Sequence, residues 1–175
     1  MDATHLHLTL THFPIIGTLF GMAILAYGQF SKNNTIIKVS LVIFILMALL
    51  TIPVYLTGEE AEETVEHIAG VSEKLIERHE ELAENAIVLM VLLGFLSIIS
   101  FFTLVRKLSF AKTATILTLA ISIITFGVFA QVGKLGGEIR HSEIRQDKFD
   151  SIEKLEKGKT IEEGTHQNDD DDDDD

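Results

Sequence analysis

Four long apolar stretches, separated by polar segments, organise the sequence. They cover about 12–30, 39–56, 82–105 and 113–132. Each is close to the roughly 20 residues that an α-helix needs to cross a bilayer. The pattern therefore predicts an all-α protein whose core is a bundle of four transmembrane helices.

The polar segment between the second and third apolar stretches has a helical periodicity of its own. Apolar side chains at Ala61, Val65 and Ile68 recur at helical spacing among glutamates, which predicts a short amphipathic helix over 59–68. Ser72 is a good N-cap for a new helix that runs on into the third apolar stretch. At about 1.5 Å per residue, that helix is long enough for its first turns to project from the membrane.

The N-terminal segment is too short for its pattern to decide between two conformations. Met1 to Leu10 alternates polar and apolar residues, and it is either an extended lead-in or an extra helical turn. Thr11 is the expected N-cap of the first span, because Pro14 is tolerated in a first helical turn.

Apolar and acidic residues are segregated along the chain, which is 47% hydrophobic and yet has a net charge of −12. The C-terminal run Asp169–Asp175 consists of like charges, which are normally disordered. We therefore expect a four-helix membrane domain over 1–145 and an acidic, largely disordered tail over 146–175.

The composition removes several classes of function. The chain has no cysteine, which excludes disulfides, thiolate metal sites, iron–sulfur clusters and thiol nucleophiles. The acidic balance and the lack of a basic face with interleaved aromatics argue against nucleic acid as a partner.

An even number of spans sorts the ionisable residues between the two membrane faces. Both termini and the acidic 59–82 connection share one face, which then holds all seven histidines and all 26 acids. The two short turns on the other face carry no acid but five basic residues, Lys32, Lys38, Arg106, Lys107 and Lys112. Because basic turns stay in the cytoplasm, both termini are predicted on the outer side of the membrane.

Three histidines are expected to meet at the acidic end of the bundle. His12 opens the first span, His79 precedes the third and His141 follows the fourth. Cofactor and metal sites in helical bundles are built from side chains on facing helices, so these three are the candidate cofactor ligands. For a metal ion, Glu59 and Glu84 complete the candidate set. Supporting polar residues at the same end are Glu60, Asn85, Glu138 and Arg140.

A simpler interpretation is that histidines and acids near helix ends are only hydrated residues of the membrane interface. We assign His5, His7 and His166 to that group. His67 lies on the polar side of its short helix and is expected to be solvated.

Four short motifs resemble a known family. They are THFPI at 11–15, LTG at 56–58, a histidine leading into the third span, and Gly136-Gly137 followed closely by His141. In this combination the chain resembles the bacterial four-helix membrane family known as domain of unknown function 2231. The resemblance implies residence in the bacterial inner membrane. It also implies redox work, since members of the family occur beside or fused to cytochrome-like modules.

Three functions remain open from the sequence. In the first, haem b is held by histidine or methionine ligands from facing helices, with His12 and His79 as the first pair to test and His141 as the third candidate. In the second, the histidines and carboxylates bind a transition-metal ion. In the third, the chain is a non-catalytic assembly subunit that binds a membrane-complex partner through its acidic extramembrane helix. A transporter is disfavoured, because no charged residue lies mid-membrane.

Overall fold

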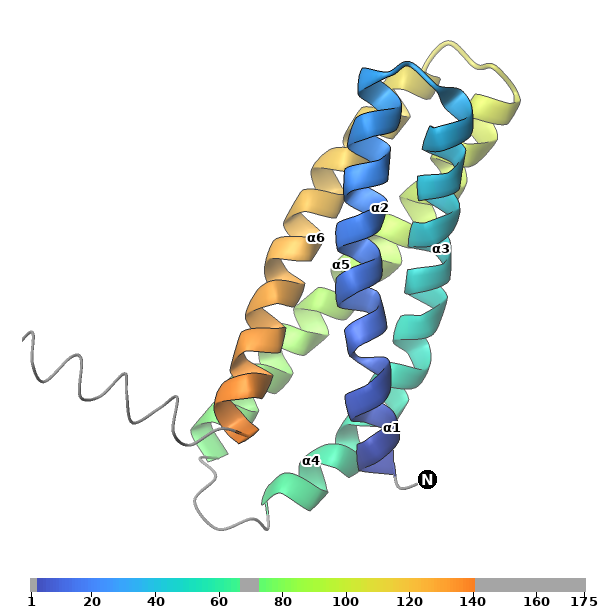
Figure 1. Cartoon of the computed structure of the whole chain (residues 1–175). Helices are drawn as coiled ribbons and strands as arrows, with labels where there is room; N and C mark the ends of the chain where they lie inside the picture. Colours follow the sequence, from blue (N-terminus) through green and yellow to red (C-terminus); the bar gives the residue numbers. More distant parts are fainter. Residues whose placement is uncertain (1–2, 67–72, 141–175) are drawn as a thin grey trace, which may run out of the picture. The chain divides into compact units, whose positions relative to one another are not determined.

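The structure, a computed structural model, describes residues 3–66 and 73–140, and all regular structure in these ranges is α-helical (Figure 1). The helices are α1 (Ala3–Leu10), α2 (His12–Phe30), α3 (Asn34–Leu56), α4 (Gly58–Glu66), α5 (Glu73–Val105) and α6 (Ala111–Arg140). The chain divides into two units, Met1–Ile139 and Arg140–Asp175. The predictions for His67, His141, His166 and the acidic tail fall outside the described residues.

Four of these helices are long and apolar enough to cross a membrane, which confirms the predicted fold class. The candidate spans are His5–Phe30, Asn34–Leu56, Glu73–Val105 and Ala111–Ile139. Their outer surface is apolar, with large side chains such as Phe30 (88% exposed) and Val88 (68% exposed) turned outward. An exposed apolar surface of this extent suits lipid rather than water. The protein is therefore a multi-pass membrane protein whose surroundings are a lipid bilayer.

The interior of the bundle combines an apolar cluster with small hydroxyl residues. Leu25, Leu41, Phe44, Met90 and Leu93 are fully buried and form the centre of the cluster. Serines and threonines also lie inside, and most of them bond to a carbonyl of their own helix. They are Thr18, Ser40, Thr51, Ser97, Ser100, Thr103, Thr115, Thr118, Ser122 and Thr125. Small and hydroxyl residues at helix contacts are typical of membrane bundles.

Two glycines of α2 allow α3 to approach closely. A Cβ on Gly21 would lie 2.6 Å from Cε1 of Phe44. One turn earlier, a Cβ on Gly17 would collide with the side chain of Met47. Two small residues four positions apart thus face a neighbouring helix, an arrangement that lets membrane helices pack closely.

The N-terminal segment is helical, and the predicted cap at Thr11 is wrong. Thr11 has a helical backbone and makes no capping bond, while its hydroxyl donates to the carbonyl of Leu8 at 3.1 Å. Proline lacks the N–H that would bond four residues back, so Pro14 leaves the carbonyl of Leu10 without its helical donor. The helix is therefore interrupted between α1 and α2 for only one residue.

The last helix is longer than the apolar pattern predicts. The predicted span ends at 132, whereas α6 runs on through three glycines to Arg140. Two of these glycines lie against other helices: a Cβ on Gly133 would contact Ile15, and one on Gly136 would contact His79. Packing against neighbours thus offsets the low helix propensity of glycine here.

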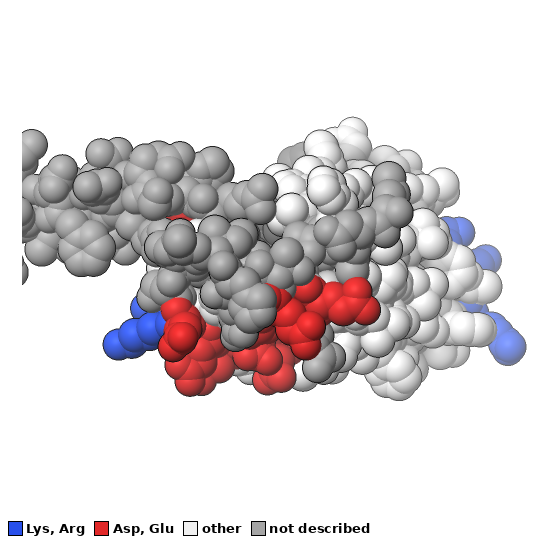
Figure 2. All heavy atoms as spheres, turned by 90° about the horizontal axis from the view of Figure 1, so that it is seen from below, with Lys and Arg blue, Asp and Glu red and all other residues white. Residues whose placement is uncertain are grey.

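The topology brings distant parts of the chain to one end of the bundle. In Figure 1, α1, α4, the start of α5 and the end of α6 share one end, and the α2–α3 and α5–α6 turns share the other. Figure 2 looks onto the first end and shows acidic side chains gathered there. The predicted sorting of charges between the two ends is confirmed for the described residues.

Candidate functional site

His79 is the most unusual polar residue at the acidic end. It lies on α5, half-buried, with its ring against α6, where a Cβ on Gly136 would stand 3.3 Å from Cε1 and 3.8 Å from Nδ1. The carbonyl of Val132 also lies near the ring. Nevertheless Nδ1 is buried and has no hydrogen-bond partner. A buried polar atom without a partner is costly, and such atoms often mark a functional site.

His7 occupies a comparable position on α1. Its Nδ1 lies 3.0 Å from the carbonyl oxygen of Val54 and 3.4 Å from the hydroxyl of Thr57, both at the end of α3. The ring also faces a glycine, since a Cβ on Gly58 would stand 3.5 Å from Cε1. A carbonyl only accepts, so Nδ1 of His7 is assigned as the donor. The neutral ring then keeps its lone pair on Nε2.

In Figure 1, α1 and the start of α5 share one end of the bundle, where the two imidazoles influence each other electrostatically. An imidazole oriented through an Nδ1–H bond to a carbonyl, with Nε2 open, is the usual arrangement of a histidine that binds a metal. The acidic end therefore holds an oriented imidazole on α1 and, on α5, an imidazole whose Nδ1 has no hydrogen-bond partner.

Sequence reasoning missed His7, which it assigned to the hydrated interface. Its place depends on whether residues 3–10 are helical, and the alternating pattern could not decide that. The available signal was the spacing of His7 and Leu10, three residues apart on one face of a helix.

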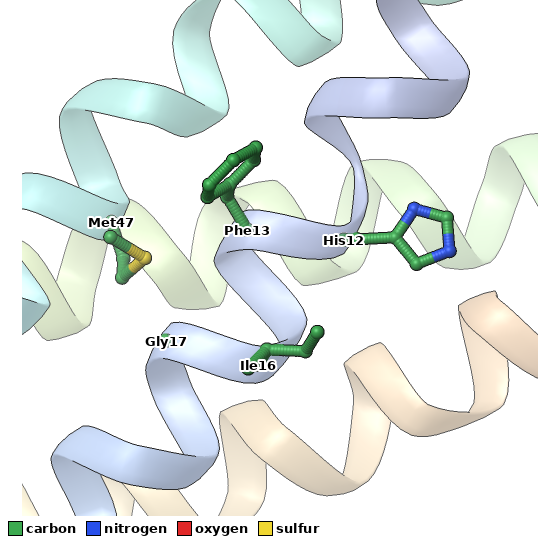
Figure 3. A pocket seen from close by; sticks show the side chains of 5 residues that line it. All are labelled: His12, Phe13, Ile16, Gly17 and Met47. Atoms are coloured by element: carbon green, nitrogen blue, oxygen red, sulfur yellow. The ribbon is translucent and has the colours of Figure 1, made fainter.

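His12 lies in different surroundings from those of His79. It is exposed, and its Nδ1 donates to the carbonyl of Leu8 at 2.9 Å. It borders an apolar pocket of about 270 Å³ lined also by Phe13, Ile16, Gly17 and Met47. In Figure 3 its ring points away from Met47, so these two side chains do not face each other across the pocket.

The other predicted site residues are mostly exposed or paired. Glu84 and Asn85 are exposed, and the amide of Asn85 donates to the carbonyl of Glu81 at 2.8 Å. Glu138 is half-buried and lies 4.0 Å from Lys134. Glu60 is exposed and has an interaction partner. The side chains of Glu59 and Arg140, and the whole of His141, lie outside the description.

In the described ranges, 3–66 and 73–140, no three histidine or acidic side chains form a group that could hold a metal ion. The ligand set predicted from the sequence extends beyond these ranges, so it stays a prediction. Among the described residues, the two half-buried histidines are His7 and His79.

The chain was compared with known protein families, curated proteins and solved structures. No family model, no curated protein and no solved structure matches the chain. The resemblance to the bacterial four-helix family stays a prediction.

Proposed function

We propose that this membrane protein binds haem b or a transition-metal ion at its acidic end, through His79 and His7, and acts as an accessory redox or electron-transfer component. The buried Nδ1 of His79, which lacks a hydrogen-bond partner, carries the proposal. His12 and His141, the other ligands expected from the sequence, are alternative or additional ligands at the same end. The bacterial inner membrane, with both termini outside, is the proposed location.

The donor chemistry at the pair fits such a group. The pair offers Nδ1 of His79 and Nε2 of His7, which are neutral imidazole nitrogens of the kind that bind iron, copper, nickel and zinc. Each ring packs against a glycine, His7 against Gly58 and His79 against Gly136. When bound, haem or a redox metal would supply one-electron transfer. The chain's own contribution is to orient the two rings and to shield one of them from water.

The number of ligands favours haem over a bare metal ion. Haem needs at most two axial ligands from the protein, whereas structural and catalytic zinc sites take three or four protein ligands. The pair supplies two. A bare ion would need further ligands, for which His141 and Glu59 are the candidates from the sequence.

The acidic surface supports a second candidate function, docking of a membrane-complex partner. Glutamates of α4 and of the first turns of α5 gather on the end seen in Figure 2. The apolar side of α4 is a weaker candidate for the contact, because Ala61 is only 8% exposed and α4 packs against α1 and α3.

The experiment is an absorbance spectrum and elemental analysis of the full-length protein purified in detergent. We expect a Soret band or a stoichiometric metal that is lost in His79→Ala and weakened in His7→Ala. His5→Ala is the matched control, because His5 is exposed on the same short helix as His7.

The outcomes separate the candidates. If the bound group is lost in His12→Ala but retained in His7→Ala, the ligands are His12 and His79, the pair expected from the sequence, and not His7 and His79. A colourless, metal-free protein that co-purifies with a larger complex would contradict cofactor binding and support partner docking.

A further inference from the structure

A second cavity lies at the opposite end of the bundle, away from the histidines. It has a volume of about 430 Å³ and is formed between the α2–α3 turn and the α5–α6 turn. Three lysines line it, Lys32, Lys107 and Lys112. The proposed redox function makes no use of this cavity.

Hydrogen bonds between the helices next to the cavity, and within each of the two turns, hold the walls of the cavity in place. The amide of Gln29 donates to the carbonyl of Thr115 at 2.9 Å and joins α2 to α6. Each turn also ends its preceding helix in the same way: Asn33 N–H bonds to Gly28 O at 2.9 Å, and Leu108 N–H bonds to Thr103 O at 3.0 Å. These bonds are those of a Schellman motif, in which one residue adopts the left-handed conformation.

That left-handed position is a lysine in both turns. Lys32 has φ 54° and Lys107 has φ 52°, a conformation that is unfavourable for a residue other than glycine. The turns thus place a cationic side chain on the cavity wall at a position where glycine would be conformationally easier.

The cavity is electropositive. All acidic residues of the described chain lie in α4, in the first turns of α5 or at Glu138, at the other end of the bundle. Among the described residues, none of the three lysines has a carboxylate partner. Helices α3 and α6 begin at Asn34 and Ala111, which also line the cavity. Their positive dipole ends add to the charge of the lysines.

The cavity is also amphipathic. Ile37, Leu104 and Leu108 contribute apolar lining. Close by, Leu108 is 43% exposed and Phe110 is 52% exposed, at the end of the lipid-facing surface of the spans. A ligand that matches this site carries a negative charge at one end and a hydrocarbon chain at the other.

We propose that this cavity binds the phosphate headgroup of an anionic phospholipid, whose acyl chains lie against the adjoining apolar surface. Basic pockets between transmembrane helices recognise anionic headgroups in this way. The lysines supply charge, and the amide of Gln29 and the hydroxyl of Ser109 are further polar groups of the lining.

The test is native mass spectrometry of the full-length protein in detergent, with phosphatidylglycerol and phosphatidylcholine added at equal concentration. We expect one phosphatidylglycerol to be retained in preference to phosphatidylcholine. The thermal midpoint should rise with phosphatidylglycerol and not with inorganic phosphate, because the apolar lining also contributes to binding.

Three substitutions remove the charge of the cavity. Lys32→Gly and Lys107→Gly suit the left-handed backbone, so the fold is kept, and Lys112→Gln removes the third charge. At roughly 1 kcal/mol for each basic residue at an anionic surface, each substitution should weaken phosphatidylglycerol binding about fivefold. Lys38→Gln and Arg106→Gln are matched controls, because both residues lie near the turns but neither lines the cavity.

Several results would overturn the proposal. Equal retention of the two lipids would refute a site for an anionic headgroup. If phosphatidylglycerol binding falls equally in the cavity variants and in the controls, the effect comes from the overall positive charge at this end and not from the cavity. Equal stabilisation by inorganic phosphate would assign the site to the free anion instead of a lipid.

Discussion

The contact between α3 and α5 gives the sharpest prediction about the fold. A Cβ added at Gly94 would lie 2.5 Å from Cβ of Ala48. Non-bonded carbon atoms settle at about 3.5–4.0 Å, so the two helices would have to separate by about 1 Å. Ala48 ends at its Cβ and cannot rotate away. We therefore expect the clash in Gly94→Ala to cost about 1–3 kcal/mol of the free energy of unfolding, the usual range for an overpacked core.

A matched variant isolates that clash. Replacing glycine by alanine inside a helix gains about 1 kcal/mol of helix propensity, which would partly hide the cost. Gly127→Ala has the same gain, but a Cβ there meets nothing within 4 Å. The difference in stability between the two variants therefore measures the clash alone. Adding Ala48→Gly to Gly94→Ala removes the opposing methyl and should restore most of the loss.

The assay is denaturant unfolding in detergent micelles, followed by far-ultraviolet circular dichroism. If Gly94→Ala proves as stable as Gly127→Ala, the close contact between α3 and α5 is refuted. A loss in Gly94→Ala that Ala48→Gly fails to rescue would assign the effect to something other than this contact.

Three further predictions concern the rest of the bundle. The hydroxyls of Ser100 and Thr118 are 2.8 Å apart and buried, so a double-mutant cycle with Ser100→Ala and Thr118→Val should give a coupling energy near 0.6 kcal/mol in micelle unfolding; additive losses would contradict the bond. Lys107→Gly should leave stability unchanged or raise it by up to about 1 kcal/mol, because glycine adopts the left-handed backbone freely; a clear loss would argue against that backbone. Since the chain has no cysteine, Glu63→Cys and Ser109→Cys should react with a membrane-impermeant thiol reagent from opposite sides of the membrane; labelling from the same side would refute the four-span topology.

The fold was predictable because the bilayer constrains it so strongly. Helices must satisfy their own backbone hydrogen bonds within lipid, so a long apolar run allows few alternatives. Helix ends were less predictable, since they depend on tertiary contacts. The apolar pattern stops at 132, but α6 continues for two further turns, in which Gly136 packs against His79.

The candidate site was only half predictable. His79 was expected at the acidic end because it precedes the third span, and the structure finds its ring packed against Gly136 of α6. The half-buried place of His7 could not be predicted, because it depends on α1 being helical and lying beside the end of α3. His12 lies in the family-like THFPI motif, and its ring nevertheless bonds to the carbonyl of Leu8 in α1 and is exposed.

The central claim is that imidazoles from α1 and α5 hold one group. X-ray absorption spectroscopy at the metal edge of the purified, full-length protein tests it most directly, because it counts the imidazole nitrogens bound to the metal. We expect two histidine ligands in the wild type and in His12→Ala, one fewer in His7→Ala, and no bound group in His79→Ala. A protein that holds neither haem nor metal, or a ligand count that falls in His12→Ala but not in His7→Ala, would contradict the account.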